Sequence, residues 1–240
     1  MSLHDKVFVV TGASSGIGEA IARELSAAGA RLVVTARRDD RLTWLCASLP
    51  SPAVKLAAAI DDPATAQALL DLALTRFGRV DGLINNAGMV VAGPLETLDL
   101  DALAQMTRVN FDAPVRAACV FARVLKAQGA GAIINVSSLG AYMSHTSMAA
   151  YAGLKQALEI FTTALRVELK GSGVRVGSIA PGTTDTEIFD GQRARGQAVK
   201  ADMSHALAPG DVAAAVRFML EQPARANVAR LMLVSSSEMA

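Results

Sequence analysis

Short apolar runs alternate with longer amphipathic stretches along almost the whole chain. The apolar runs predict strands, at residues 7–11, 31–35, 54–60, 80–85, 132–136, 174–179 and 231–234. The stretches between them have apolar positions at helical spacing and predict helices, at residues 16–28, 40–49, 63–77, 99–128, 149–171 and 210–221. Runs without polar alternation are typical of strands covered on both faces, and helical crossovers require parallel pairing. The pattern predicts one α/β domain over residues 1–240, a doubly wound parallel sheet of about seven strands with helices on both faces.

One polar segment, residues 183–208, breaks this rhythm beside the end of the predicted strand at 174–179. It contains two glycines and a basic cluster, at Gly191, Gly196, Arg193, Arg195 and Lys200. A long insertion at such a place is either a substrate lid or surface elaboration, and its position favours the lid.

Composition narrows the class of protein. Apolar residues make up 52% of the chain but aromatic residues only 4%, so small residues supply much of the core and suit close helix–sheet packing. Lysine and arginine number 23 against 22 acidic residues, so no charge excess points to nucleic acid or an anionic membrane. No apolar run reaches the roughly 18 residues of a membrane span, and the first residues lack the pattern of a signal peptide. Cys46 and Cys119 form no metal motif, so we expect a soluble, cytoplasmic protein without a metal site.

The first predicted strand runs into a glycine-rich turn, Thr11-Gly12-Ala13-Ser14-Ser15-Gly16-Ile17-Gly18. Gly12 permits a tight turn, Gly16 lets the backbone approach a pyrophosphate, and Gly18 allows close helix–strand packing. The helix that follows presents unpaired N–H groups and a positive dipole to phosphate. A plain strand–turn–helix connection is the alternative, but the position after the first strand favours dinucleotide binding. The expected contacts to the cofactor are Gly12, Ser14, Ser15, Gly16, Ile17 and Gly18.

The second predicted strand leads into Ala36, Arg37 and Arg38. An acidic residue here usually binds the ribose 2′-hydroxyl of NAD, whereas an arginine accommodates the 2′-phosphate of NADP. Ala36 stands where the acid would be, and both guanidinium groups can pair with a dianionic phosphate. A solvated basic turn balanced by Asp39 and Asp40 is the alternative. The sequence favours NADP(H) as the cofactor.

Tyr151 and Lys155 lie four residues apart near the start of a predicted helix and therefore share a face. A phenol with a pKa near 10 is a poor acid–base catalyst at neutral pH, but a cationic lysine one turn away favours the phenolate and lowers that pKa. Ser138 follows a predicted strand at the carboxyl edge of the sheet, where open α/β sheets bind ligands. The three side chains form a candidate catalytic group.

Together these motifs resemble the classical short-chain dehydrogenase/reductase family, of the NADP-preferring type. The resemblance also includes the run from Asn85 to Gly88, Asn110, and Pro181-Gly182 with Thr186, in the family's order over almost the whole chain. It implies a single Rossmann-type domain and hydride transfer between nicotinamide C4 and a carbonyl or secondary alcohol. The alternatives are an epimerase or isomerase that retains the hydride, and a cofactor-sensing binding module on the same fold.

The resemblance implies a role for each matching residue. Tyr151 is the general acid in carbonyl reduction and the base in alcohol oxidation, and Ser138 stabilises charge on the substrate oxygen. Lys155 lowers the pKa of Tyr151 and binds the nicotinamide ribose. Asn110 holds a water of a proton relay. Pro114 lacks the backbone N–H that would normally bond the Asn110 carbonyl, so we expect the helix to kink near Pro114. Further cofactor contacts are expected at Asn86, Ala87, Gly88, Pro181, Gly182, Thr183 and Thr186.

The chain departs from the family at the adenine. The family usually has an Asp-Val-like pair after the third strand, but Ala59 and Ile60 stand there. Asp61 lies one residue later and either substitutes for the missing acid or faces solvent. Ile60 and Asp61 are therefore the expected adenine contacts.

Three stretches are expected to line the substrate pocket: the residues after Gly88, the loop after Ser138, and the lid. Methionines adapt to irregular ligands, which suits a small to medium, largely apolar substrate. A solvent-facing role is the alternative for the loop histidine. The expected substrate contacts are Ser138, Met89, Val90, Leu139, Tyr142, Met143, His145, Met148, Glu187, Ile188 and Phe189.

The predicted helix at 149–171 carries two apolar stripes about a third of a turn apart. The first holds Leu154, Leu158, Phe161, Leu165 and Leu169, and the second holds Ala157, Ile160, Ala164 and Val167. One stripe can cover the sheet, whereas the other needs a second partner. We expect a homo-oligomer, a dimer or a homotetramer, packed through this helix. Coverage by the helix at 99–128 is the alternative.

Overall fold

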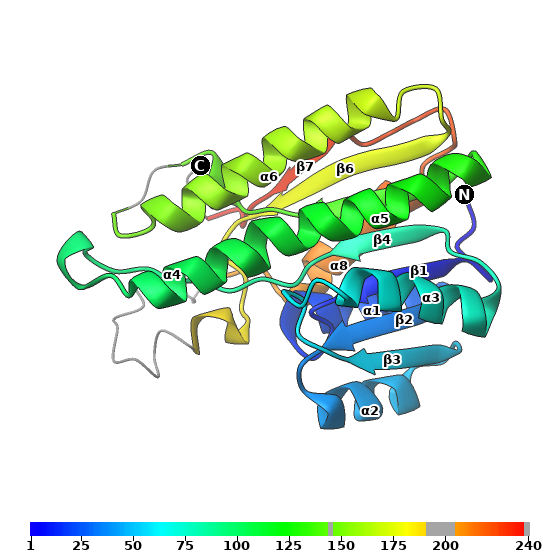
Figure 1. The fold of residues 1–240 in the computed structure, drawn as a ribbon, viewed down its shortest axis with the longest axis horizontal. Coiled ribbons are helices and arrows are strands. Elements are labelled where there is room, and N and C mark those ends of the chain that lie inside the picture. The colour runs from blue at the N-terminus through cyan, green and yellow to red at the C-terminus, as the bar shows by residue number, and fades with distance from the viewer. Residues whose placement is uncertain (144–145, 191–204, 238–240) are drawn as a thin grey trace.

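The computed structural model describes residues 1–143, 146–190 and 205–237. Its strands form one sheet in the order β3-β2-β1-β4-β5-β6-β7, and every neighbouring pair is parallel (Figure 1). The sheet confirms the predicted Rossmann-type architecture. The strands span Val7–Thr11 (β1), Arg31–Ala36 (β2), Ala53–Ala57 (β3), Gly82–Asn85 (β4), Gly131–Val136 (β5), Val174–Pro181 (β6) and Arg230–Leu233 (β7).

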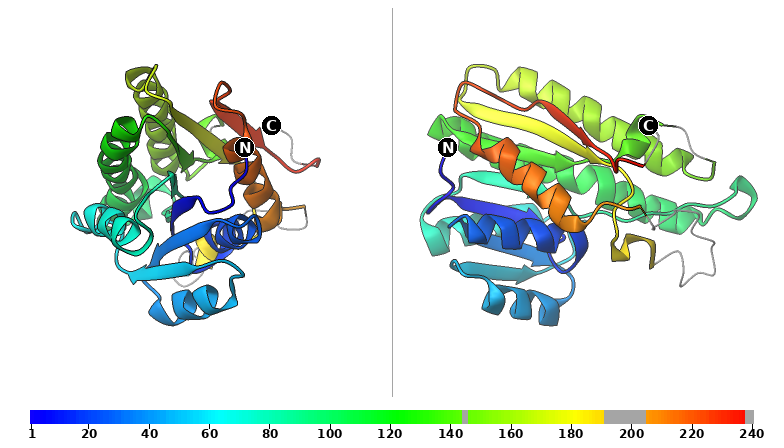
Figure 2. Two further views of the ribbon diagram at one scale, coloured as in Figure 1. Left: turned by 90° about the vertical axis from the view of Figure 1, so that its right-hand side faces the viewer. Right: turned by 180° about the vertical axis from the view of Figure 1, so that it is seen from behind.

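Helices cover both faces of the sheet, as the end-on view in Figure 2 shows. Alternate residues of β1 explain why: Phe8 belongs to the apolar cluster on one face, and Val9 to the cluster on the other. One layer consists of α1 (Gly16–Ala27), α2 (Asp39–Ser48) and α8 (Pro209–Glu221). The other consists of α3 (Thr65–Phe77), α5 (Ala113–Gln128) and α6 (Ala149–Glu168).

The strand order reverses at β1, which pairs with β2 on one side and with β4 on the other. The connections that leave the two strands therefore diverge to opposite halves of the sheet. A crevice forms at such a point outside the carboxyl ends of the strands, and ligands of open α/β sheets bind there. The glycine-rich turn after β1 and the segment after β4 border this crevice.

The predicted helical stretch at 99–128 is helical but interrupted. α4 (Leu100–Thr107) passes into a π-helical turn, η2 (Arg108–Asp112), before α5 begins. The Ala113 N–H bonds the Arg108 carbonyl, five residues back instead of four. Pro114 lies in the first turn of α5, where a missing N–H costs least. The interruption expected near Pro114 is present, in the form of one extra residue in a helical turn.

The third strand is shorter than predicted and ends at Ala57. β2 also ends at Ala36, whose carbonyl accepts a last hydrogen bond from the Ala58 N–H at 3.0 Å. The chain then turns toward α3, and the Ala59 carbonyl accepts a hydrogen bond from the Thr65 hydroxyl at 2.8 Å. The residues expected at the adenine therefore lie in a turn instead of a strand.

Two findings apply to residues 1–143, 146–190 and 205–237. No helix there is long and apolar enough to cross a membrane. In the same part of the chain, no three His, Cys, Asp or Glu side chains come close enough together to hold a metal ion.

Candidate functional site

A cleft of about 1480 Å³ follows the carboxyl ends of the strands. Its walls come from segments that lie far apart in the sequence. Of the predicted cofactor residues, it is lined by Gly12, Ser14, Ser15, Gly16, Ile17, Arg37, Arg38, Ile60, Asp61, Asn86, Ala87, Gly88, Tyr151, Lys155, Pro181, Gly182, Thr183 and Thr186.

The glycine-rich turn lies backbone to backbone against the segment after β4. Gly12 has φ +69°, and a side chain there would place its first carbon 2.8 Å from the Ala87 Cα. At Gly18, near the start of α1, a Cβ would overlap the Gly12 carbonyl and the Asn86 side-chain amide. Gly18 does not line the cleft, so its part is to let the turn and α1 approach this segment.

Thr11 ties the ends of β1 and β4 together. Its hydroxyl oxygen accepts hydrogen bonds from the backbone N–H groups of Asn86 (2.9 Å) and Ala87 (3.0 Å). The Asn86 side-chain amide returns a bond to the Thr11 carbonyl at 2.9 Å. Sequence reasoning gave Thr11 no role, although its place at the last position of an apolar strand before a glycine was visible.

A buried polar network continues behind the cleft. Asn85 donates to the Asn135 side-chain oxygen (2.9 Å) and to the Pro114 carbonyl (3.1 Å). Asn135 in turn donates to the Thr162 hydroxyl at 2.8 Å. The network joins β4, β5, α5 and α6, and satisfied buried networks of this kind rigidify their surroundings. Sequence reasoning missed Asn135 and Thr162, because polar residues inside apolar runs give no sign of their partners.

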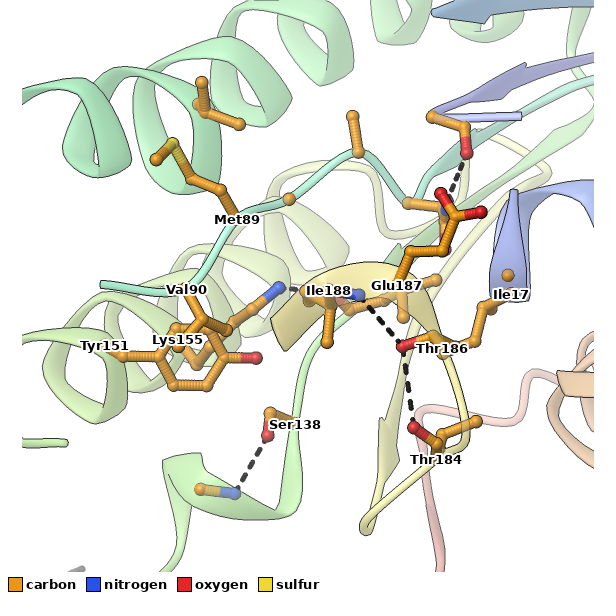
Figure 3. Close-up of a pocket in the computed structure, with 18 of the residues that line it drawn as sticks. Ile17, Met89, Val90, Ser138, Tyr151, Lys155, Thr184, Thr186, Glu187 and Ile188 are labelled. Atoms are coloured by element: carbon orange, nitrogen blue, oxygen red, sulfur yellow. Dashed lines mark hydrogen bonds between the residues drawn. The ribbon is translucent and has the colours of Figure 1, made fainter. Parts of the chain in front are cut away.

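The three candidate catalytic side chains meet at the end of β5. Ser138 precedes η3 (Leu139–Ala141) and its Oγ accepts a hydrogen bond from the Gly140 N–H at 3.1 Å. Tyr151 and Lys155 lie in the first two turns of α6 and are 7% and 5% exposed. The Lys155 Nζ donates to the Val136 carbonyl at 2.9 Å. Figure 3 shows the phenol oxygen of Tyr151 turned toward Ser138.

Burial dominates the electrostatics of this group. It raises the pKa of Tyr151, and the Ser138 hydroxyl opposes only part of that rise. It also lowers the pKa of Lys155 to about 8, against the attraction of the Glu159 carboxylate. The Lys155 Nζ lies 5.8 Å from the centroid of the Tyr151 ring, and the expected lowering of the Tyr151 pKa by Lys155 stays a prediction.

Asn110 lies on the π-helical turn with its side chain buried. Its Oδ1 accepts a hydrogen bond from the Met89 N–H at 2.9 Å, and its Nδ2 donates to the Met89 carbonyl at 2.8 Å. These two hydrogen bonds fix the backbone of Met89, the residue after Gly88. A Cβ added to Gly88 would lie 3.5 Å from the Asn110 Oδ1 and 3.9 Å from the Lys155 Nζ. The side chain is thus engaged in holding backbone, and the expected water relay stays a prediction.

The two arginines after β2 differ in their surroundings. Arg38 donates to the hydroxyls of Ser14 and Ser15 in the glycine-rich turn, whereas Arg37 is exposed at the edge of the cleft. Arg41 also lines the cleft and was missed. The signal was available, because Arg41 lies three residues after Arg38 at the start of a helix, and such residues share a face.

The two residues expected at the adenine line the cleft, and their contact with adenine stays a prediction. Ile60 and Asp61 line it together with Ala58, whereas Ala59 does not. Asp61 does not simply face solvent, since its Oδ2 lies 4.0 Å from the Arg108 Nε.

Apolar side chains gather around Tyr151 at the substrate end. Met89, Val90, Met148 and Ile188 pack in one cluster with it. The predicted substrate contacts that line the cleft are Ser138, Met89, Val90, Leu139, Met143, Met148, Glu187 and Ile188.

Tyr142 is a correction to the predicted pocket. It lies on the loop after Ser138 but does not line the cleft, because its ring turns away to pack 5.1 Å from the Arg230 guanidinium of β7. Burial raises the pKa of its hydroxyl. The predictions for His145, for the Phe189 side chain and for lid residues 191–204 lie outside the described part of the structure.

Comparisons with known proteins agree with this geometry. A family model described as short chain dehydrogenase matches residues 6–197. The chain is 33% identical to an uncharacterized oxidoreductase of Staphylococcus saprophyticus over 99% of this chain and 98% of the relative. An oxidoreductase of Staphylococcus epidermidis is also 33% identical, over 93% and 94% of the two chains.

Two solved structures share the fold. An alcohol dehydrogenase from the archaeon Thermococcus sibiricus, complexed with 5-hydroxy-NADP, superposes with a TM-score of 0.87 at 29% identity over 99% of both chains. A metagenomic short-chain oxidoreductase in complex with NADP gives a TM-score of 0.83 at 31% identity, over 99% of this chain and 100% of that one.

Gly18→Ala tests the close approach of the turn. The new methyl group would overlap the Gly12 carbonyl, so we expect a loss of about 1–3 kcal/mol in the free energy of unfolding, measured with urea. Gly153→Ala is the control, because a Cβ at that position of α6 meets nothing within 4 Å. It should leave stability unchanged or raise it by up to about 1 kcal/mol. Equal effects of the two substitutions would contradict the packing account.

Proposed function

The chain belongs to the short-chain dehydrogenase/reductase family of oxidoreductases, and from this premise we propose that it is an NADP(H)-dependent enzyme. Its proposed reaction moves a hydride between nicotinamide C4 and the carbonyl carbon of a small to medium, largely apolar ketone, aldehyde or secondary alcohol. The observation that carries the proposal is the meeting of Ser138, Tyr151 and Lys155 in the same cleft as the glycine-rich turn.

The residues present fit a nicotinamide dinucleotide. Gly12 and Gly18 leave no side chain between the turn and the segment after β4, so the backbone is free to contact a pyrophosphate at the start of α1. Arg37 and Arg38 supply cationic groups at the same cleft for a 2′-phosphate. Two similar solved proteins carry NADP or a derivative, which supports the same preference. When bound, the cofactor would supply or accept the hydride.

The side chains of this protein supply the proton and the electrostatic field. In carbonyl reduction, Tyr151 donates its phenol proton to the oxygen that becomes the alcohol. Ser138 donates a hydrogen bond to the same oxygen as charge develops on it. Lys155 provides a buried positive charge beside the phenol, and Asn110 holds the backbone of Met89 at the wall of the pocket.

Two other functions remain as competing hypotheses. An epimerase or isomerase would use the same cofactor but would show no net change in nicotinamide absorbance. A cofactor-sensing module would bind the dinucleotide without turnover. The buried Tyr151 favours an enzyme over the cofactor-sensing module, because a binding module has no need of a proton donor in its cleft. Net turnover of the cofactor separates the oxidoreductase from the epimerase or isomerase.

Tyr151→Phe is expected to lower kcat for NADPH-dependent reduction of medium-sized apolar ketones by at least about 10²-fold, because it removes the proton donor. The dissociation constant for NADPH should stay within a few-fold of wild type, measured by nicotinamide fluorescence. Tyr142→Phe removes the same hydroxyl from the chain's other tyrosine, outside the cleft, and should stay nearly as active as wild type. Full activity of Tyr151→Phe would overturn the mechanism.

Arg37→Asp is expected to shift the ratio of kcat/KM for NADPH over NADH toward NADH by about tenfold or more. The substitution replaces a cation that attracts the 2′-phosphate by an acid that can bind the ribose hydroxyl. Arg76→Asp, at the end of α3, makes the same charge change elsewhere and should leave the ratio unaltered. An unchanged ratio in Arg37→Asp would remove that residue from the cofactor site.

We also infer that the protein forms a homo-oligomer through α6. Ile160 and Val167 are 61% and 67% exposed on one side of this helix, whereas Leu158 and Leu165 are buried. The second apolar stripe is therefore not covered by α5, and a symmetric contact with another copy would bury it.

Light scattering at micromolar concentration is expected to give a mass above that of the 24.9 kDa chain. Ile160→Asp should dissociate the assembly, since it places a charge in the buried contact. Leu74→Asp changes an exposed leucine on α3 and should leave the mass unaltered. A wild-type protein that is monomeric would refute the assembly.

A further inference from the structure

Glu187 joins two arginines across the mouth of the cleft. Its Oε2 accepts a hydrogen bond from the Arg38 Nη1 at 2.7 Å, and its Oε1 accepts one from the Arg41 Nη1 at 2.6 Å. The arginines lie at the start of α2, whereas Glu187 begins η4 (Glu187–Phe189) after β6. All three residues line the cleft. We call this contact the carboxylate bridge.

Arg38 is fixed independently of the bridge. Its Nε donates to the Ser14 Oγ at 3.1 Å, and its Nη2 donates to the Oγ atoms of Ser14 (3.0 Å) and Ser15 (2.7 Å). Both serines belong to the glycine-rich turn. The guanidinium is thus held over the turn, with Nη1 as the nitrogen that bonds Glu187.

The backbone of Glu187 is held close to the same turn. A Cβ on Gly16 would lie 3.0 Å from the Thr186 Cγ2, so the segment after β6 rests against the turn. Thr186 also caps η4, because its Oγ1 accepts a hydrogen bond from the Ile188 N–H at 3.4 Å. Figure 3 shows Thr186 beside Ile17, with Glu187 on the same short helix as Ile188.

We propose that the Glu187 carboxylate is an internal competitor for the 2′-phosphate of NADP(H) and so limits the preference for NADP(H) over NAD(H). This inference rests on the proposed NADP(H) site at Arg37 and Arg38. A carboxylate and a phosphate seek the same guanidinium N–H donors, and two anions at one place repel each other. The phosphate therefore displaces Glu187 from Arg38, whereas NAD(H) has a hydroxyl there and leaves the bridge intact.

The local charges allow this exchange. Arg37 is exposed and forms no hydrogen bond or ion pair with the described residues, so it is available to the incoming phosphate. Asp39, two residues after Arg37, forms an ion pair with Lys55. The side chains of Arg38, Arg41 and Glu187 are 39%, 43% and 42% exposed, so water screens the bridge and a dianion can replace it.

The carboxylate is charged under all ordinary assay conditions. Hydrogen bonds from Arg41 and Arg38 lower the pKa of Glu187 to about 2. Competition with the phosphate is consequently a property of the enzyme throughout the neutral pH range.

The test compares Glu187→Gln with wild type in fluorescence titrations with NADPH and NADH. Glutamine keeps the shape and removes the charge, so the dissociation constant for NADPH should fall roughly three- to tenfold, the range that one or two exposed ion pairs account for. The dissociation constant for NADH should change less than about twofold, because NADH has no 2′-phosphate to compete with Glu187. An unchanged NADH constant also shows that the variant is folded. Glu24→Gln is the matched control, since it breaks an exposed ion pair with Arg217 outside the cleft.

A fragment titration separates the phosphate from the nicotinamide. Adenosine 2′,5′-bisphosphate should bind more tightly to Glu187→Gln than to wild type, whereas adenosine 5′-monophosphate should bind both equally. Glu187→Ala provides a second variant without the carboxylate and should shift the NADPH and bisphosphate constants in the same direction.

The titrations distinguish failure of the competition from failure of the NADP(H) site. Weaker or unchanged NADPH binding in both Glu187 variants, with wild type preferring NADPH, overturns the competition and leaves the NADP(H) assignment standing. An equal gain for NADPH and NADH also overturns it, since the effect would not depend on the 2′-phosphate. A wild-type protein that prefers NADH, or binds neither dinucleotide, refutes the NADP(H) site itself and the competition with it.

Discussion

Two loops from opposite halves of the sheet, the turn after β1 and the segment after β4, touch backbone to backbone. The contact exists because Gly12 and Gly18 carry no side chain, and Thr11 holds it closed with hydrogen bonds to Asn86 and Ala87. Gly12, Asn86 and Ala87 all line the cleft, so the contact forms part of its wall. The serines that carry Arg38 belong to the same turn, so the cofactor end of the site takes its geometry from this one approach of main chains.

The proposed chemistry depends on exclusion of water at the opposite end. Tyr151 and Lys155 are almost fully buried, and desolvation moves their pKa values in opposite directions, upward for the phenol and downward for the ammonium. Buried polar groups need a rigid surrounding in which each finds its partner. The network of Asn85, Asn135 and Thr162 supplies such a surrounding beneath α6.

The sheet and much of the cleft could be predicted because their signals are local. Strands covered on both faces appear as continuous apolar runs, and glycines mark places where main chains must meet. The π-helical turn could not be predicted in detail, since one extra residue barely alters an apolar periodicity. The ion pair of Arg41 with Glu187 joins positions 146 residues apart, and no local pattern announces it. Tyr142 was misplaced because a sequence does not say to which side of a loop a side chain turns.

The π-helical turn separates the directions in which α4 and α5 present their apolar side chains. One extra residue resets the rotational phase between the helical segments on either side, by about 100°. α4 directs Met106 into the cluster around Tyr151, while α5 directs Phe121 into the core against the sheet. The two helical segments therefore pack against different parts of the molecule, although they follow one another along the chain. A substitution at Met106 acts first on the cluster around Tyr151, whereas one at Phe121 acts first on the core against the sheet.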